Sequence, residues 1–371
     1  MGPDGRTGPA RIGAIAVSAP LETVTPSLRM ATTSDYARIT AFLAAHPDAT
    51  PFHEVAWLEA VSASTGHEAT VLLCEERGGI AGLLPLHAVR SPLLGAALIS
   101  TGFGVGGGIL AATPRAMSLL AGAAEELAGR LACTSIELRG GALPEDRKGW
   151  TVRRDAHANF VAPLAADPQV QLLAIPRKQR AEVRRGLGHA MDVTVGNGSA
   201  DRAAHYAVYA QSVRNLGTPV FPRALFEAVL DRFGEAADIL IVRHDGQPVA
   251  SVLSLYHRGA VMPYWGGGTG EARSLRANDV MYYALMDHAR GRGCERFDFG
   301  RSKTGSGAYH FKRNWGFEPQ PLAYASWTAD GTPPRDADPN SPRYKARIAA
   351  WRKLPLGVAN RLGPLIARGL A

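Results

Sequence analysis

The chain is poor in cysteine, and its 371 residues contain no long apolar run. Cys74, Cys133 and Cys294 are too widely spaced to form a four-ligand metal site by themselves. No apolar run approaches the roughly 18 residues that a membrane-spanning helix needs. These absences argue against a metal site and a spanning helix. They favour a soluble or peripheral protein in a reducing cytoplasm.

The N-terminal residues lack the continuous apolar stretch of a cleavable signal and are interrupted by Pro3, Pro9, Pro20 and Pro26. We therefore predict a disordered N-terminal tail over residues 1–28. The whole chain is 46% hydrophobic and 20% charged, which is an ordinary globular composition. Its length predicts about two domains.

The net charge of +8 comes from two short segments. Residues 176–190 carry five Lys or Arg and one Glu, and residues 329–371 carry eight Lys or Arg and three Asp. Local charges of +4 and +5 leave −1 for the rest of the chain. Each segment is a candidate anion-binding surface. The first segment is predicted to be a helix with cations on several faces, among them Lys178, Arg180 and Arg184, and a solvated basic helix is the alternative.

The order of expected elements in the first half recurs in the second. Each half reads as a strand, two helices, a hairpin, a glycine-rich turn, a helix and a closing strand. Phe52 and Phe221 are 169 residues apart, and Cys133 and Cys294 are 161 apart. One eight-residue difference between the loops reconciles these offsets. The pattern predicts a tandem repeat in which both cysteines pack before equivalent strands.

Glycine runs follow the fourth strand of each half, TGFGVGGG in the first and GGGTG in the second. Such a run before a helix can expose backbone N–H groups to a phosphate. Arg273 and Arg276 precede the helix in the second half and are candidate binding residues. Neither run matches a Walker or dinucleotide fingerprint, so a plain loop is the alternative reading.

Polar chemistry is concentrated in FDFGRSKTGSGAYHFKRNWGFEPQPLAYASW, residues 297–327. A short buried strand ends at glycine, a loop with Arg and Lys follows, and a helical segment and a second strand complete the stretch. A solvated rim is the alternative reading for the cations. The candidate residues of this stretch are Asp298, Arg301, Ser302, Lys303, Tyr309 and Lys312.

The order of elements resembles the acetyltransferase unit of the GNAT superfamily. Two units in one chain resemble the FemAB-type peptidyltransferases and their BioF2-like relatives. FDFGRS, FKRNWGFEPQPLAY, SVRNLGTPVFP and PRKQRAEVRRG are similar to FemAB-like proteins associated with PEP-CTERM/exosortase exopolysaccharide systems. The resemblance implies an α/β (α+β) fold of tandem GNAT-like domains with mixed, mostly antiparallel sheets. We place the domains at residues 29–165 and 166–328, followed by a basic amphipathic tail at 329–371.

The resemblance also implies transfer of an acyl or aminoacyl group to an amine or hydroxyl of a cell-envelope or exopolysaccharide precursor. The donor would be aminoacyl-tRNA or acyl-CoA, with no tightly bound cofactor and no metal. GNAT enzymes commonly have a tyrosine four residues before a Gly-Phe pair, but Lys312 holds that position here, before Gly316 and Phe317. No good match to the CoA-binding loop is present either. Both departures favour aminoacyl-tRNA.

Within this reading, Lys312 stabilises the negative charge that develops on the carbonyl oxygen during acyl transfer. Arg301 anchors a phosphate or carboxylate, and Asp298 is a candidate base. The alternative role for Asp298 is a structural hydrogen bond that holds the following loop. Tyr264 and Tyr309 could orient the acyl group or simply pack.

Two questions stay open at this stage. A catalytically silent assembly component of an exopolysaccharide or exosortase system is the alternative to an enzyme. The segment from Ser341 onward has the pattern of a basic amphipathic helix broken at Pro355, and a second break at Pro364 is left open. It either packs on the second domain or lies on an anionic membrane, which would make the protein peripheral at the inner face.

Overall fold

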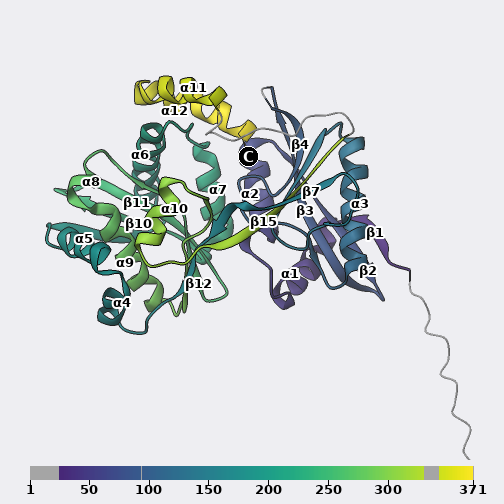
Figure 1. Cartoon of the computed structure of the whole chain (residues 1–371), viewed down its shortest axis with the longest axis horizontal. Helices are drawn as coiled ribbons and strands as arrows, with labels where there is room; N and C mark the ends of the chain where they lie inside the picture. The colour runs from purple at the N-terminus through teal and green to yellow at the C-terminus, as the bar shows by residue number, and fades with distance from the viewer. Residues whose placement is uncertain (1–24, 93, 330–341, 371) are drawn as a thin grey trace, which may run out of the picture.

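The computed structural model describes residues 25–92, 94–329 and 342–370 (Figure 1). Most of the N-terminal tail expected at residues 1–28, and the first part of the C-terminal tail, lie outside these ranges. Two β-sheets with helices packed on their faces form the described part of the chain. The expected α/β class with two mixed sheets is confirmed.

The first unit contains its elements in the order expected from its sequence. Its helices are α1 (Tyr36–Ala45), α2 (Val55–Thr65) and α3 (Pro114–Arg130). Its strands are β1 (Ser27–Met30), β2 (Glu68–Glu76), β3 (Gly79–Ser91), β4 (Gly95–Ser100), β5 (Leu110–Ala111), β6 (Ser135–Arg139) and β7 (Trp150–Asn159).

The second unit repeats this order after two additional helices, α4 (Pro168–Ala174) and α5 (Arg177–Leu187). Its other helices are α6 (Ser199–Leu216), α7 (Arg223–Phe233), α8 (Ala272–Leu275) and α9 (Ala277–Gly291). Its strands are β8 (Val161–Pro163), β9 (Met191–Gly196), β10 (Ala237–His244), β11 (Gln247–His257), β12 (Ala260–Gly268) and β13 (Arg296–Asp298). The chain continues with β14 (Ser302–Lys303), α10 (Gly307–Asn314), β15 (Gln320–Thr328), α11 (Pro342–Arg352) and α12 (Leu356–Ala367).

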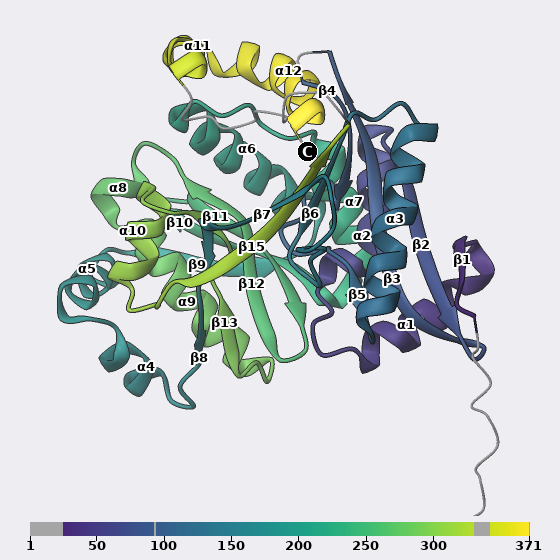
Figure 2. The same ribbon diagram turned by 45° about the vertical axis from the view of Figure 1, so that its right-hand side comes forward.

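The two sheets exchange strands. Among the described residues, the order of the first sheet is β1-β2-β3-β4-β6-β15-β7-β14 with β5 beside β3, and that of the second is β8-β13-β12-β11-β10-β9. Residues 161–163, which the sequence placed in the domain at residues 29–165, form β8, and β8 pairs with β13 of the second sheet. Conversely, β15 leaves the second unit and pairs with β6 and β7 (Figure 2). Sequence pattern alone does not specify which sheet receives a strand, because pairing partners are set by tertiary packing.

A shared hydrophobic core joins the units. It lies between α2 and α7 and includes the buried residues Trp57, Phe226 and Trp265. The ring of Trp265 lies 4.7 Å from that of Phe226 and 5.8 Å from that of Trp57. An interface built from buried aromatic side chains resists relative motion of the units far more than a polar contact would.

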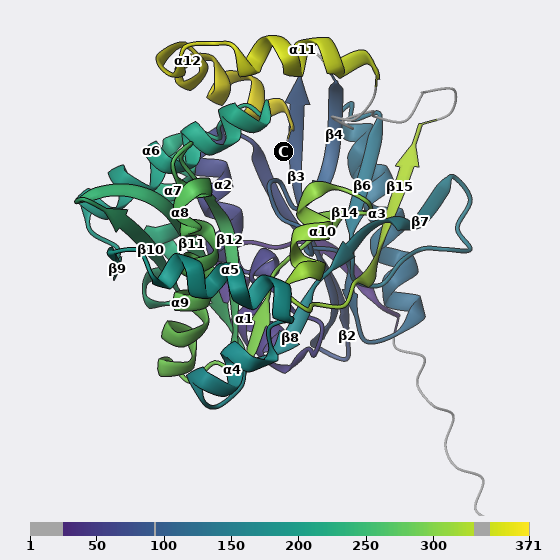
Figure 3. The same cartoon turned by 60° about the vertical axis from the view of Figure 1, so that its left-hand side comes forward.

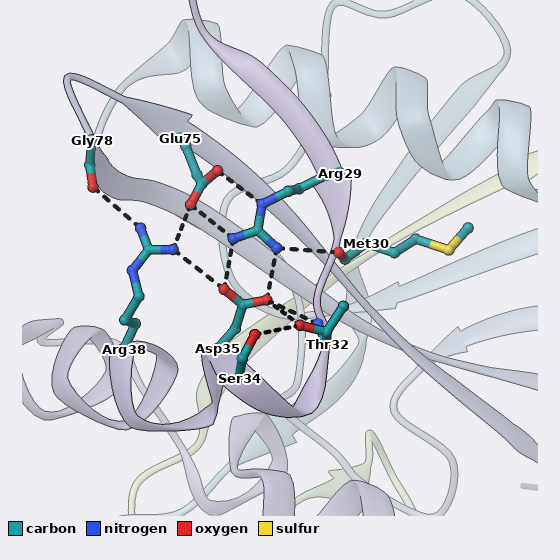
Figure 4. A network of polar contacts seen from close by, with 8 residues as sticks. All are labelled: Arg29, Met30, Thr32, Ser34, Asp35, Arg38, Glu75 and Gly78. Carbon is teal, nitrogen blue, oxygen red and sulfur yellow. Dashed lines mark hydrogen bonds and ion pairs between the residues drawn. The ribbon is translucent and has the colours of Figure 1, made fainter.

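A charged network ties the first strand to the sheet (Figure 4). Arg29 lies between Asp35 and Glu75, with its Nη2 2.6 Å from Asp35 Oδ1 and its Nε 2.9 Å from Glu75 Oε2. Arg38 contacts the same two carboxylates. The hydrogen bond from Arg29 is the main reason why the pKa of Asp35 lies well below its usual range. A network of this kind fixes β1 to α1 and β2 more firmly than an isolated surface pair.

The C-terminal helices pack across both units (Figure 3). Both α11 and α12 contact α6, and the turn at Arg368–Leu370 contacts β3. The expected break at Pro355 is present, but α12 continues through Pro364 to Ala367. The small residues Ala359, Gly363 and Ala367 form its buried face.

Candidate functional site

The candidate site is built where β13 ends and α10 begins. Gly300 and Gly305 have positive φ angles of 73° and 74°, which let the loop between them turn sharply. The side-chain oxygen of Ser306 accepts a hydrogen bond from the N–H of Tyr309 and caps α10. The oxygen Oδ1 of Asp298 accepts a hydrogen bond from the N–H of Gly300 at 2.9 Å. The loop is therefore held at both ends.

Lys312 points back from α10 under this loop. Its Nζ donates to the carbonyl oxygens of Gly300 at 2.8 Å and Arg301 at 3.0 Å. Nζ also lies 5.5 Å from the ring centres of Phe160 and Phe299. Burial lowers the pKa of Lys312 to about 7, an effect that Asp298 opposes and Arg301 reinforces. The predicted cation is thus buried beneath the loop and anchors it, with two of its three N–H donors in use.

The surroundings of Asp298 agree with both roles considered for it, that of a base and that of a structural hydrogen-bond acceptor. Burial raises the pKa of its carboxyl group, while hydrogen bonds from Gly300 and Asn159 and the charge of Lys312 oppose that rise. A carboxylate with a raised pKa is a better proton acceptor. Its hydrogen bond to Gly300 also holds the loop, as the structural reading expects.

Arg301 reaches across to the exchanged strand β15. Its Nη1 donates to the phenol oxygen of Tyr324 at 3.1 Å, and the Tyr324 hydroxyl donates to the carbonyl oxygen of Val105 at 2.9 Å. The ring of His157 stacks on Tyr324, with 5.2 Å between ring centres. Burial, reinforced by Arg301, lowers the pKa of His157 to about 4. A neutral imidazole therefore lies beside the guanidinium at neutral pH.

The glycine run of the first unit faces this cluster through its carbonyl groups. The Tyr264 hydroxyl donates to the carbonyl of Phe103, and Tyr324 donates to that of Val105. Arg139 Nη1 donates to the carbonyls of Thr101 and Gly104 at 3.1 Å and 2.7 Å. A phosphate loop would present N–H groups instead, so the plain-loop reading fits this run.

Close packing accounts for the glycines of the second run. A Cβ at Gly267 would lie 2.3 Å from Ser212 Oγ, and one at Gly268 would lie 2.7 Å from Asn278 Oδ1. Arg276 adopts a left-handed conformation before α9 and pairs with Glu182 at 2.7 Å. Arg273 is exposed. The glycines therefore admit α6 and α9 close to the strand.

The basic helix α5 begins beside the end of α10. A Cβ at Gly316 would lie 3.0 Å from Pro176 Cδ, immediately before α5. Lys178 and Arg184 are exposed, and Arg180 Nη1 donates to the carbonyl of Leu173 at 2.9 Å. The exposed pair is thus available to an anion, whereas Arg180 is partly committed to the protein.

The remaining predicted residues are placed as follows. Ser302 is buried on β14, and its hydroxyl is without a hydrogen-bond partner among the described residues. Lys303 is half-buried on the same strand. The ring of Tyr309 packs edge-on against Phe160 with 5.3 Å between ring centres, a contact that the packing alternative expects. Tyr264 is tied to the first unit by the hydrogen bond described above.

Sequence reasoning missed the contribution of the first sheet. A cavity of about 170 Å³ lies against β6, β15 and β7, on the face that carries Tyr324. Its polar lining residues are Ser135, Glu137, Arg153, His157, Tyr324, Ser326 and Thr328. The sequence repeat held one signal for this contribution. Glu137 and Asp298 are 161 residues apart, the same offset as between Cys133 and Cys294, so Glu137 is the first-unit equivalent of Asp298.

Comparison with known proteins agrees with the fold. Residues 177–313 match the family described as "Acetyltransferase (GNAT) domain". No curated protein sequence matches the chain. The similarity by sequence to this family thus lies within the second half of the chain.

Several solved structures share the tandem arrangement. FemX superimposes with a TM-score of 0.61 at 14% identity, covering 81% of this chain and 98% of that chain. A tandem GNAT protein from the clavulanic acid biosynthesis pathway gives 0.54 at 13% identity, with coverage of 84% and 100%. The C-terminal domain of a putative lysylphosphatidylglycerol synthetase from Agrobacterium fabrum gives 0.53 at 12% identity, with coverage of 80% and 92%. The chain therefore has the tandem GNAT-like fold.

Residues 25–92, 94–329 and 342–370 bear on two kinds of function, metal binding and membrane spanning. Within them, no group of three or more His, Cys, Asp or Glu side chains is arranged to hold a metal ion. None of the helices in those ranges has the length and apolar character needed to cross a bilayer. The three thiols are free, and burial raises the pKa of each, which fits the packing role expected for Cys133 and Cys294.

Proposed function

We propose that the protein transfers an acyl or aminoacyl group to an amine or hydroxyl of a cell-envelope or exopolysaccharide precursor. The observation that carries the proposal is the loop at 300–306, which joins Asp298, Arg301 and Lys312 within the segment that matches the GNAT domain. Association with an exopolysaccharide or exosortase system belongs to the same proposal and rests on the sequence motifs.

In this proposal the acceptor attacks the donor carbonyl at the loop. The carbonyl oxygen gains negative charge as the new bond forms, and a fixed cation stabilises that charge. Lys312 retains one N–H donor beyond the two that hold the loop. Asp298 accepts the proton that the acceptor loses, because its raised pKa favours the protonated product. The bond from the carbonyl carbon to the donor oxygen or sulfur then breaks, and the departing oxygen or sulfur takes up that proton.

Substrate anions would be bound by cations at two distances from the loop. Arg301 is the near candidate, since its position is fixed by Tyr324. Lys178 and Arg184 are exposed on α5, which begins beside Gly316 at the end of α10, and they suit a phosphate of the donor or acceptor. The polar cavity beside Tyr324 and His157 suits a hydroxyl-rich part of the acceptor.

Aminoacyl-tRNA is our first choice of donor, and acyl-CoA is the second. Lys312 replaces the tyrosine that would protonate a departing thiolate, and the second glycine run is filled by Ser212 and Asn278. Those two observations weaken the case for a bound CoA pyrophosphate at that turn.

A second candidate function is a catalytically silent component of an envelope assembly. It is favoured by one observation, that Nζ of Lys312 is already hydrogen bonded to two loop carbonyls. In that case Lys312 would have only a structural role.

The two functions are separated by incubating the purified protein with lipid-linked sugar precursors and a panel of aminoacyl-tRNA and acyl-CoA donors. Mass spectrometry of the precursor should show a donor-dependent increment with wild type. Lys312→Met and Arg301→Gln should lose it, while Arg313→Gln, an exposed change on the same helix, should keep it. A precursor of unchanged mass with every donor, together with complementation of a deletion strain by Lys312→Met, would favour the silent component.

A further inference from the structure

The helix α12 is apolar on two opposite faces. Its inner face consists of small residues, and a Cβ at Gly363 would lie 2.9 Å from Val220. On the outer face, Val358, Leu362 and Leu365 are 41%, 44% and 69% exposed. Positions i, i+4 and i+7 share one side of a helix, so these side chains form a continuous stripe. Leu365 borders a hollow beside residues 66–68 and 88–92, but all three side chains stay at least 41% exposed, so packing on the protein leaves much of the stripe uncovered.

Cations lie beside the stripe, and carboxylate side chains are absent from this part of the sequence. Residues 342–370 contain seven Lys or Arg and no Asp or Glu. Lys353, Arg361 and Arg368 are exposed. Arg361 lies within one helical turn of both Val358 and Leu365, so charge and apolar surface are adjacent. The helices α11 and α12 form one edge of the molecule in Figures 1 and 3.

We propose that α12 and the end of α11 form a docking surface for an anionic lipid bilayer. Val358, Leu362 and Leu365 enter the headgroup layer, and Lys353, Arg361 and Arg368 contact lipid phosphates. An interfacial helix of this kind combines an apolar face with flanking cations, and both contribute to binding. The sequence left packing and membrane contact as alternatives, but the two faces of α12 allow both at once.

A second copy of the chain is a poorer occupant of this surface. A two-fold interface would place the same patch against itself, so cations would face cations without a carboxylate from residues 342–370 to offset them. The surface of an anionic bilayer has the complementary charge. The inference is independent of the proposed activity, and its test measures binding alone.

The test uses the purified full chain and flotation with vesicles. Wild type should bind vesicles of mixed phosphatidylcholine and phosphatidylglycerol, bind phosphatidylcholine alone much less, and be released by high salt. The double substitution Leu362→Ser and Leu365→Ser should lower the partition coefficient by about tenfold or more, because two apolar side chains no longer enter the bilayer. Lys353→Gln with Arg361→Gln should lower binding to the anionic vesicles only.

Matched controls are available elsewhere on the surface. Val170 and Leu173 on α4 are 55% and 61% exposed, and changing both to serine should leave vesicle binding unchanged. Arg130→Gln with Lys148→Gln is the corresponding control for charge, since both side chains are exposed. Urea unfolding of each variant checks that the fold is retained.

Three results would overturn the proposal. One is equal flotation of wild type and the Leu362/Leu365 variant. Another is an equal effect of the control substitutions on α4. The third is concentration-dependent dimerisation in sedimentation analysis that the Leu362/Leu365 variant abolishes, without vesicle binding by wild type, which would assign the stripe to a second copy of the chain.

Discussion

Replacing Lys312 by methionine removes a buried ammonium group while nearly conserving side-chain length and volume. Burial lowers the pKa of Lys312 from 10.5 to about 7. At about 1.4 kcal/mol per pKa unit, the protonated form costs the fold on the order of 5 kcal/mol at pH 7 or below. The substitution removes that cost but leaves the carbonyls of Gly300 and Arg301 without a donor, at about 1–3 kcal/mol each. The two effects nearly cancel at neutral pH.

The difference in stability between wild type and Lys312→Met changes with pH, and the direction of this change can be tested. Because the unfolded lysine ionises near 10.5 and the folded one near 7, the unfolded chain binds more protons between these values. The free energy of unfolding of wild type therefore rises through this window. The methionine variant lacks this contribution. We expect the variant to be close to wild type in stability at pH 6.5 and clearly less stable at pH 9.5.

Urea unfolding of both proteins at pH 6.5, 8 and 9.5 measures this difference, because the other titrating groups are common to both. Turnover of the variant at pH 7 should fall by about 10² or more, the loss expected for one transition-state stabiliser. Lys312→Ala should lower turnover similarly, and Arg313→Gln should change neither property. A stability difference that is constant across the pH range would refute the lowered pKa. Equal turnover would refute the catalytic role.

Three further predictions concern the cluster at Tyr324, the donor and the buried histidines. Tyr324→Phe removes the hydroxyl between Arg301 and Val105 and should lower the free energy of unfolding by about 1–3 kcal/mol. Turnover should fall as well, and an unchanged urea midpoint would contradict the prediction. Aminoacyl-tRNA binding should weaken steeply with salt, whereas saturable CoA binding in calorimetry without tRNA retention at low salt would reverse our order of donors. Burial lowers the pKa of His53 and of His87 to about 4, so the unfolded chain takes up protons first as pH falls below about 6.5. Stability should therefore fall from pH 6.5 towards 4, by on the order of 3 kcal/mol per histidine, and His87→Gln should reduce this slope in urea unfolding.

The sequence predicted the local elements well because hydrophobic period and turn residues are local signals. The two helices and the hairpin predicted for the second half are present as α6, α7 and the antiparallel pair β10 and β11. The repeat was detectable because equivalent residues such as Cys133 and Cys294 precede equivalent strands, β6 and β13. The helix α4 was missed, since its seven residues are too few for a clear period.

The exchange of strands could not be read from the same signals. The sequence of a strand such as β15 does not show which strands it pairs with. Its partners, β6 and β7, lie more than a hundred residues earlier in the chain. For this reason Tyr324 was treated as part of a motif, while its contacts with Val105 and His157 were not foreseen. The direction in which Lys312 points was also not accessible, because a side chain's hydrogen-bond partners depend on the loop's tertiary position.

The repeat explains why the two halves use an equivalent strand end differently. In the first unit, Glu137 on β6 pairs with Arg139 at 2.7 Å, and Arg139 is occupied by carbonyls of the glycine run. In the second, Asp298 holds a loop whose arginine, Arg301, reaches Tyr324 on the exchanged strand. The first copy thus supplies a rigid surface beside the site. The second copy supplies the loop and Lys312, whose pKa is lowered by burial. Because β15 belongs to the second copy by sequence and to the first by pairing, the arrangement around Arg301 requires both copies to be folded together.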